Sequence, residues 1–377
     1  MQGLRIKEYV DKLIDEKGIP YLDILVQKEH KTLFRYLRDK DGQATEQTQL
    51  FLYSCTKPLT VACAMKLIEE GKLSLNDEVA KYLPEYGNAF LLGENGEKRP
   101  TKNKMTVRQL LTMTGGLNYD FGAAPVQELV KRGGGTTVEF ANAFIKSPLS
   151  FEPGERFQYS LCLDVISAII EVVTGKRFSE YMQETLFEPL GMHDCFFHGG
   201  YERVGNLYIC DDNGKITQMD KVHWHILSEN QDGGGSGVIG TVEDYAKFAD
   251  ALACGGVGGN GRRILKESSI NEAAKEQLSH LDTISVDNAF TCVQGGEYGY
   301  GFGMRTRLVP TEWGLPKGEF GWDGAAGSYL MVDKERGISV VIGMHLLNWP
   351  MVFTGEHLNL VKCVYEDMHE EDLLSIK

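Results

Sequence analysis

The sequence predicts an α/β protein in which both ends of the chain contribute strands to one sheet and the middle forms helices. Residues 21–26 and 32–37 carry the apolar, aromatic and β-branched side chains typical of strands, and residues 329–333 and 339–344 do so again. Between about residues 77 and 200, apolar side chains instead recur at helical spacing. The simplest architecture is a sheet built from both termini with helices inserted between them.

The domain division follows from this order of elements. Residues 1–76 and 295–377 are expected to form a discontinuous α/β domain, and residues 77–294 a mainly helical inserted domain. Residues 334–337 (Lys-Glu-Arg-Gly) separate the last two strands and are typical of a hairpin turn.

The N-terminal segment begins with an amphipathic helix. Ile6, Val10, Leu13 and Ile14 fall at helical spacing, and Gly18 follows as a stop. The two predicted N-terminal strands come directly after this glycine.

A third short strand at residues 50–53 leads into a helix with well-defined ends. Proline is tolerated in the first turn of a helix but not in its interior, so Pro58 places the start near residues 54–57. Gly71 ends the helix.

Caps and glycine stops predict the later helices. Residues 106–109 (Thr-Val-Arg-Gln) form a capping box, and residues 241–244 (Thr-Val-Glu-Asp) cap a helix that runs to Cys254. Further helices are expected at residues 161–173, at residues 178–187 and around Leu358, Val361 and Val364.

Composition excludes several classes of protein. The 377 residues include 39 Lys and Arg against 53 Asp and Glu, so the net charge is −14. Such a chain repels phosphate backbones and anionic lipid surfaces, and we expect neither nucleic acid nor a membrane as partner. No apolar run approaches the roughly 20 residues that cross a bilayer. Residues 1–18 lack the apolar core of a signal peptide, so a cytoplasmic location is expected.

The eight cysteines are scattered and form no C-x-x-C pair. In a cytoplasmic chain this favours free, mostly buried thiols over a disulfide framework or a zinc cluster.

Ser54 and Lys57 form an S-x-x-K tetrapeptide. Residues three apart on a helix share a face, so the lysine amine can reach the serine hydroxyl. A serine hydroxyl becomes a useful nucleophile when a neighbouring base takes its proton, and lysine serves as that base if burial lowers its pKa. A capping serine beside a solvated lysine is the alternative interpretation of the same tetrapeptide.

Two further segments are candidates for the same chemistry. Tyr159 follows a Pro-Gly turn and precedes a predicted helix, and beside a lysine its phenol could act as general base and acid. Residues 320–329 place small residues next to a strand, where a backbone N–H could stabilise an oxyanion. A core tyrosine and a glycine-rich strand entry are the alternatives.

Other motifs are weaker. Residues 235–240 and 256–261 match G-x-G-x-x-G, but neither joins a buried strand to a following helix, so a dinucleotide cofactor is not expected. His223 and His225 have no neighbouring ligands that complete a metal site, so we expect a surface or structural role. The G-x-S-x-G elbow of α/β-hydrolases is absent.

Taken in order, these segments resemble the serine β-lactamase and penicillin-binding-protein superfamily over nearly the whole chain. The resemblance is closest to the branch with class C β-lactamases and family VIII carboxylesterases. It implies a β-lactamase-like (DD-peptidase/transpeptidase) fold, with an antiparallel sheet flanked by helices and an inserted helical domain. The matching segments are residues 54–58 (SCTKP), 70–79 (EGKLSLNDEV), 82–85 (YLPE), 110–117 (LLTMTGGL), 153–160, 233–248 and 298–303 (YGYGFG).

The resemblance also implies roles for individual residues, in an active site between the two domains. Ser54 would be the acylated nucleophile, and Lys57 and Tyr159 would shuttle its proton. The backbone N–H groups of Ser54 and Ala325 would form the oxyanion hole. Which of Lys57 and Tyr159 is the base stays open at this point.

Two departures from the class C pattern point to the substrate. Leu161 occupies the asparagine position of Y-x-N, and Trp322-Asp323-Gly324 stands in place of K-T-G. A cation that would hold a lactam carboxylate is thus replaced by an indole, and burying an unpaired anion is costly. Leu161, Trp322, Asp323 and Gly324 are therefore expected to line a pocket for neutral esters, as in family VIII esterases.

We expect a serine hydrolase of the carboxylesterase type that cleaves small or medium acyl esters through an acyl-Ser54 intermediate. Its partner would be a small-molecule acyl substrate, and no metal or organic cofactor is expected. Three alternatives stay open: a β-lactamase or D-amino-acid peptidase or amidase, an acyltransferase, and a catalytically silent binding protein. The natural substrate and the oligomeric state are not predicted. Four aromatic residues belong either to the pocket or to the core: Tyr119, Phe157, Trp313 and Trp349.

Overall fold

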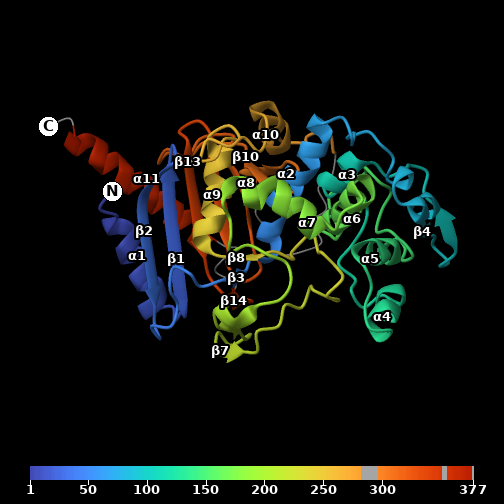
Figure 1. Cartoon of the computed structure of the whole chain (residues 1–377), viewed down its shortest axis with the longest axis horizontal. Helices are drawn as coiled ribbons and strands as arrows, with labels where there is room; N and C mark the ends of the chain where they lie inside the picture. Colours follow the sequence, from blue (N-terminus) through green and yellow to red (C-terminus); the bar gives the residue numbers. More distant parts are fainter. Residues whose placement is uncertain (282–295, 350–354, 376–377) are drawn as a thin grey trace.

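The computed structural model describes residues 1–281, 296–349 and 355–375, and these include a seven-stranded antiparallel sheet (Figure 1). Strands from the two ends of the chain pair directly, because β1 lies between β2 and β13. In sheet order the strands are β2 (Lys31–Asp39), β1 (Tyr21–Lys28), β13 (Ile338–Gly343), β12 (Tyr329–Asp333), β11 (Phe320–Asp323), β10 (Arg305–Arg307) and β9 (Tyr298–Tyr300). The predicted antiparallel sheet is confirmed.

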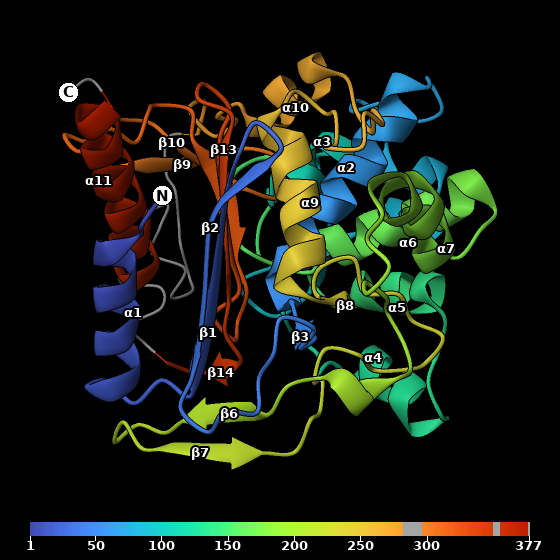
Figure 2. The same cartoon turned by 60° about the vertical axis from the view of Figure 1, so that its left-hand side comes forward.

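Helices cover both faces of this sheet (Figure 2). The first and last helices, α1 (Leu4–Asp15) and α11 (His357–Ser375), lie side by side on one face, and α9 (Val242–Ala253) packs on the other. The predicted apolar face of α1 is buried against the sheet, with Ile6 and Val10 fully inaccessible to solvent. Burying such faces is the main favourable term in folding.

A second group of helices lies beyond α9, on the side of the molecule away from α1 and α11 (Figure 2). The helix α2 (Thr56–Glu69) packs against α6, and its apolar residues belong to the largest core cluster. The remaining helices are α3 (Val107–Leu111), α4 (Ala124–Lys131), α5 (Thr137–Phe144), α6 (Cys162–Thr174), α7 (Phe178–Met182), α8 (Glu188–Leu190) and α10 (Glu267–Ala274).

Short strands and single turns complete the described part of the chain. The short strands are β3 (Leu50–Phe51) with β8 (Ile239–Gly240), β4 (Phe90–Leu92) with β5 (Lys98–Pro100), and β6 (Leu207–Cys210) with β7 (Ile216–Met219) and β14 (Leu346–Leu347). Because α9 belongs to residues 77–294 but packs on the main sheet, the division into two domains stays a proposal.

Local signals predicted most helix ends correctly. Thr106 and Gln109 form the predicted capping box, the Thr241 side chain accepts from the Asp244 N–H, and Gly175 ends α6 in the left-handed conformation. The expected third strand is shorter than residues 50–53, because the backbone turns at Tyr53. The helix expected over residues 178–187 changes to π-helical geometry after α7.

Two expectations from composition can be compared with the described residues. No helix among them combines the length and the apolar character that a bilayer span requires. Seven of the eight cysteines lie in the described ranges, and all seven are free thiols. The eighth, Cys292, lies outside those ranges.

Candidate active site

Ser54 and Lys57 lie where a short 3₁₀ turn, η1 (Tyr53–Cys55), runs into α2. Pro58 occupies the first turn of α2, as its fixed φ permits. Both side chains are buried, and the Lys57 Nζ lies 3.1 Å from the Ser54 Oγ. The geometry therefore brings together the amine and the hydroxyl that the tetrapeptide predicted.

The residue before Ser54 has an unusual backbone conformation. Tyr53 has φ of 45°, a left-handed value that costs a residue other than glycine about 1–3 kcal/mol. Its ring stacks on His223 with the ring centroids 4.6 Å apart. This packing helps to hold the turn that presents Ser54.

The amine of Lys57 has three polar neighbours within hydrogen-bond distance. Besides Ser54, it lies 3.1 Å from the Tyr119 hydroxyl and 2.7 Å from the Gly235 carbonyl oxygen. Burial lowers the pKa of Lys57 to about 7, although the nearby Asp164 carboxylate acts in the opposite direction. An appreciable fraction of this lysine is therefore neutral near pH 7, and a neutral amine can accept a proton.

Asp164 reaches Lys57 indirectly, through the Gly235 peptide. Its Oδ1 accepts a hydrogen bond of 3.1 Å from the Gly235 N–H, and the carbonyl of Gly235 accepts from Lys57. Burial raises the pKa of Asp164, and Lys57 partly counteracts this. A Cβ on residue 235 would lie 2.4 Å from the Asp164 Oδ2, so only glycine fits there. The glycine-rich segment thus serves to bring a backbone carbonyl close to Lys57.

Tyr159 completes the group, since its hydroxyl shares hydrogen bonds with the side chains of Ser54 and Tyr119. The Trp322 Nε1–H, which can only donate, lies 3.1 Å from the Tyr159 oxygen. Burial raises the pKa of Tyr159, and these hydrogen bonds lower it in part. The hydroxyl, the amine and the phenol predicted from the sequence therefore lie within one hydrogen-bonded network.

The turn between β11 and β12 packs against the segment that carries Ser54. The Cys55 Sγ lies 3.6 Å from the Trp322 carbonyl oxygen, and a Cβ on Gly324 would lie 2.4 Å from the carbonyl oxygen of Leu52. Gly324 therefore fits closely behind the nucleophile turn, and the half-buried Ala325 follows it. An oxyanion hole formed by the N–H groups of Ser54 and Ala325 stays a prediction.

The four residues expected to line the substrate pocket do not all lie together. Leu161 and Trp322 are almost fully buried, at 3% and 1% exposure, and the Trp322 indole contacts Tyr159. Asp323 follows Trp322 along β11 and faces the other side of the sheet. Its carboxylate accepts from Arg305 at 3.0 Å and lies 3.2 Å from His357 Nδ1, so the structure does not bring it to Ser54.

Histidines and aromatic side chains surround the network. His223 is buried and bonds through Nε2 to the Ser236 carbonyl, while His225 stacks on Phe121 and lies close to Tyr119. Burial lowers the pKa of His223 to about 3 and that of His225 to about 4, so both rings are neutral near pH 7. Their structural role was expected, but their position beside the Ser54 site was not.

Of the four aromatic residues considered for the pocket, Tyr119 alone is hydrogen-bonded to Lys57 in the described part of the chain. Phe157 packs on Tyr300. Trp313 packs on Tyr365, and Trp349 belongs to the core between the sheet and the terminal helices.

The chain belongs to the beta-lactamase family, whose sequence profile matches residues 6–359. It is 25% identical to esterase EstB of Burkholderia gladioli, over 90% of this chain and 89% of EstB. Its structure is similar to that of EstCE1, a hydrolase with promiscuous acyltransferase activity, with a TM-score of 0.76, 22% identity and coverage of 96% and 97% of the two chains. It is also similar to simvastatin synthase (LovD) from Aspergillus terreus, with a TM-score of 0.77, 21% identity and the same coverage. The fold is therefore that of the β-lactamase and penicillin-binding-protein superfamily, as the sequence motifs predicted.

Proposed function

We propose that this protein is a serine hydrolase of the esterase type, which cleaves small or medium acyl esters through an acyl intermediate on Ser54. The observation that carries the proposal is the buried Lys57 amine, 3.1 Å from the Ser54 hydroxyl and with a pKa near 7. A lysine that stayed protonated could not take the serine proton. The similarity to esterase EstB supports an ester substrate.

In this mechanism Lys57 is the base and Tyr159 the acid. Burial favours the neutral form of both groups, which is the proton-accepting form of the amine and the proton-donating form of the phenol. The Ser54 proton passes to Lys57 as Oγ bonds to the ester carbonyl carbon. The carbonyl oxygen becomes an oxyanion, stabilised by the N–H groups of Ser54 and Ala325.

Collapse of this intermediate breaks the ester C–O bond. Tyr159 gives its proton to the departing alkoxide and recovers one from Lys57 through their shared network. Water then repeats the sequence on the acyl-enzyme, releasing the carboxylic acid and restoring the Ser54 hydroxyl. Within the protein, protons pass between Ser54 and Lys57 directly, and between Lys57 and Tyr159 by way of the Ser54 and Tyr119 hydroxyls.

The proposal favours esters over β-lactams because of Trp322. Its indole supplies a neutral N–H to Tyr159, at the position where the related motif has a lysine. An anionic lactam would therefore lack that positive charge, and an uncompensated buried anion is costly.

The test compares turnover of p-nitrophenyl acetate and butyrate with that of a chromogenic cephalosporin. We expect efficient ester turnover in the wild type and a loss of about 1,000-fold or more in Ser54→Ala. The exposed Ser150→Ala variant is the matched control and should keep full activity. Ester turnover that survives in Ser54→Ala would contradict the proposal, and more efficient lactam turnover would establish the β-lactamase alternative instead.

Acyl transfer is a second candidate, because the similar structure EstCE1 is described as a hydrolase with promiscuous acyltransferase activity. The first half-reaction is common to both activities, and only the second nucleophile differs. Adding a primary alcohol during ester turnover and quantifying the new ester separates them. A product that is mostly the new ester at low alcohol concentration would identify a transferase.

A further inference from the structure

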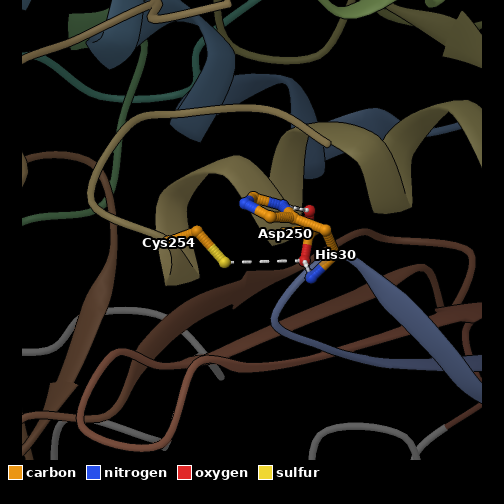
Figure 3. Close-up of side chains that lie close together, drawn as sticks. All are labelled: His30, Asp250 and Cys254. Atoms are coloured by element: carbon orange, nitrogen blue, oxygen red, sulfur yellow. Dashed lines mark hydrogen bonds and ion pairs between the residues drawn. The ribbon is translucent and has the colours of Figure 1, made fainter. Parts of the chain in front are cut away.

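Outside the Ser54 site, three side chains with metal-binding chemistry meet where the β1–β2 turn touches the C-terminal end of α9 (Figure 3). They are His30 from the turn, Asp250 from the last turn of α9, and Cys254 directly after it. One ligand atom from each lies within 4.8 Å of the other two. None of the three belongs to the hydrogen-bonded network of Ser54.

The local structure fixes this arrangement. Asp250 and Cys254 are four residues apart, so they share one face of the helix end. The backbone N–H of His30 donates to the Asp250 Oδ1 at 3.0 Å, which anchors the turn to the helix. Asp250 is buried, Cys254 is half-buried, and 35% of the His30 side chain is exposed. An ion can therefore reach the cluster from the solvent on the exposed side of the imidazole.

We propose that His30, Asp250 and Cys254 form a zinc-binding site. Imidazole nitrogen, carboxylate oxygen and thiolate sulfur are the donors that Zn²⁺ prefers, and three protein ligands leave a fourth position for water. A thiolate and a carboxylate together carry two negative charges, which Zn²⁺ neutralises. The bound ion would connect the β1–β2 hairpin, which belongs to the main sheet, to α9, which packs on that sheet.

The distances require one small adjustment. In a tetrahedral zinc site, sulfur and oxygen ligands lie about 3.6 Å apart and nitrogen and oxygen ligands about 3.3 Å apart. The Cys254 Sγ lies 3.7 Å from Asp250 Oδ1, which already fits. The His30 Nδ1 lies 2.6 Å from Asp250 Oδ2, the distance of a hydrogen bond. The two contacts use different oxygens of the Asp250 carboxylate, so the ion requires Asp250 to bind through both oxygens and the exposed imidazole to move outward by about 0.7 Å.

Two of the cations around the cluster are bound to other residues. The surrounding depression is lined by Lys28, Glu29, Lys334, Glu335 and Arg336. Lys334 is bound to Glu267 and Asn271, and Arg336 to Asp333, so neither cation is free to occupy the site.

The test uses the full-length protein, reduced and stripped of metal with EDTA, and titrates it with Zn²⁺ by calorimetry. The wild type should bind one equivalent, and His30→Ala and Cys254→Ser should each weaken binding by about tenfold or more. Cys363→Ser is the matched control, because Cys363 is the other half-buried thiol of the described residues and should not affect binding. Zinc should also raise the melting temperature of the wild type but not that of Cys254→Ser.

Cobalt gives a spectroscopic readout that reports the sulfur ligand directly. Co²⁺ bound by the wild type should show a thiolate-to-metal charge-transfer band, which is absent in Cys254→Ser and present in Cys363→Ser. A wild type without this band, or Cys254→Ser that binds zinc as tightly as Cys363→Ser, would overturn the proposal. Ester turnover should not change with zinc at this site, so this result is independent of the proposed function.

Discussion

The Lys57 side chain is fully buried, and its amine lies within hydrogen-bond distance of Ser54, Tyr119 and the Gly235 carbonyl. Two effects oppose each other there. Burial favours the neutral amine, whereas the Asp164 carboxylate favours the charged form, and burial is the larger effect. The rate should therefore depend on pH through this one group.

We expect kcat/KM for ester hydrolysis to rise with pH through about 7, because only neutral Lys57 accepts the Ser54 proton. Activity is lost as the pH falls below that value and the amine becomes protonated. In Asp164→Asn the carboxylate charge is gone while the amide oxygen still accepts from Gly235, so the rise should move to lower pH. The pH profiles of both proteins measure this shift.

A profile of Asp164→Asn that coincides with that of the wild type would show that Asp164 has no electrostatic effect on the base. Lys57→Arg is the second check, since guanidinium stays protonated at any accessible pH. Activity retained in that variant would exclude Lys57 as the base.

Tyr159→Phe should lower kcat by at least about 100-fold, the usual effect of losing a positioned acid. The Tyr86 hydroxyl is also buried, but it donates to the Ala141 carbonyl outside the site. Tyr86→Phe therefore controls for the loss of a buried tyrosine hydroxyl. Comparing the steady-state rates of the two variants tests the role of Tyr159. Similar, near-normal rates in both would remove Tyr159 from the mechanism.

The position of a site residue was predictable where its partner lies nearby in the sequence. Ser54 and Lys57 share one helical turn, so their proximity follows from spacing alone. The contact between Asp164 and Gly235 was not predicted, because these residues are 71 positions apart in the sequence and meet only in the folded chain. The available signal was the glycine-rich segment itself, because glycine often marks a place where another group packs closely against the backbone.

At the scale of elements, β11 holds both Trp322, which contacts Tyr159, and Asp323, which faces the opposite side of the sheet. Arg305 and His357 hold the Asp323 carboxylate at the end of the strand. Although burial acts to raise its pKa, Arg305 keeps the pKa of Asp323 below the ordinary value. This ion pair therefore holds the end of β11, from which the turn with Gly324 and Ala325 continues.

Asp323→Ala should lower the free energy of unfolding by about 3 kcal/mol, because it leaves the buried Arg305 guanidinium with only part of its compensation. Urea denaturation measures the change. Glu78→Ala removes the exposed ion pair with Lys104 and should cost at most about 1 kcal/mol. Equal losses in the two variants would show that the Asp323 pair has no special structural role.

Element ends were predictable from caps, prolines and glycines, because these act within one turn. The length of the third strand was not predictable, since the strand ends where Tyr53 adopts a left-handed conformation and its ring packs against the distant His223. Nothing in residues 50–53 alone encodes that contact. The sequence also did not indicate that the Asp323 carboxylate lies against Arg305 and His357, because a motif match does not say which face of a strand a side chain occupies.

At the scale of the whole molecule, the order of strands and helices was sufficient to predict one sheet built from both termini. The position of α9 on that sheet was not predicted, because a helical pattern does not say which surface it covers. The site draws on η1, α2, the segment before α6, β11 and the glycine-rich segment, which are distant in sequence. From the sequence, only the family resemblance indicated that these segments belong to one site.

The most direct measurement is peptide mapping by mass spectrometry after rapid quenching of a reaction with p-nitrophenyl butyrate. The account predicts a butyryl group on Ser54 in the wild type, formed at a rate that matches the first release of p-nitrophenol. Ser54→Ala should carry no adduct. Acylation of another residue, or full ester turnover without any covalent adduct at the earliest times, would contradict the account.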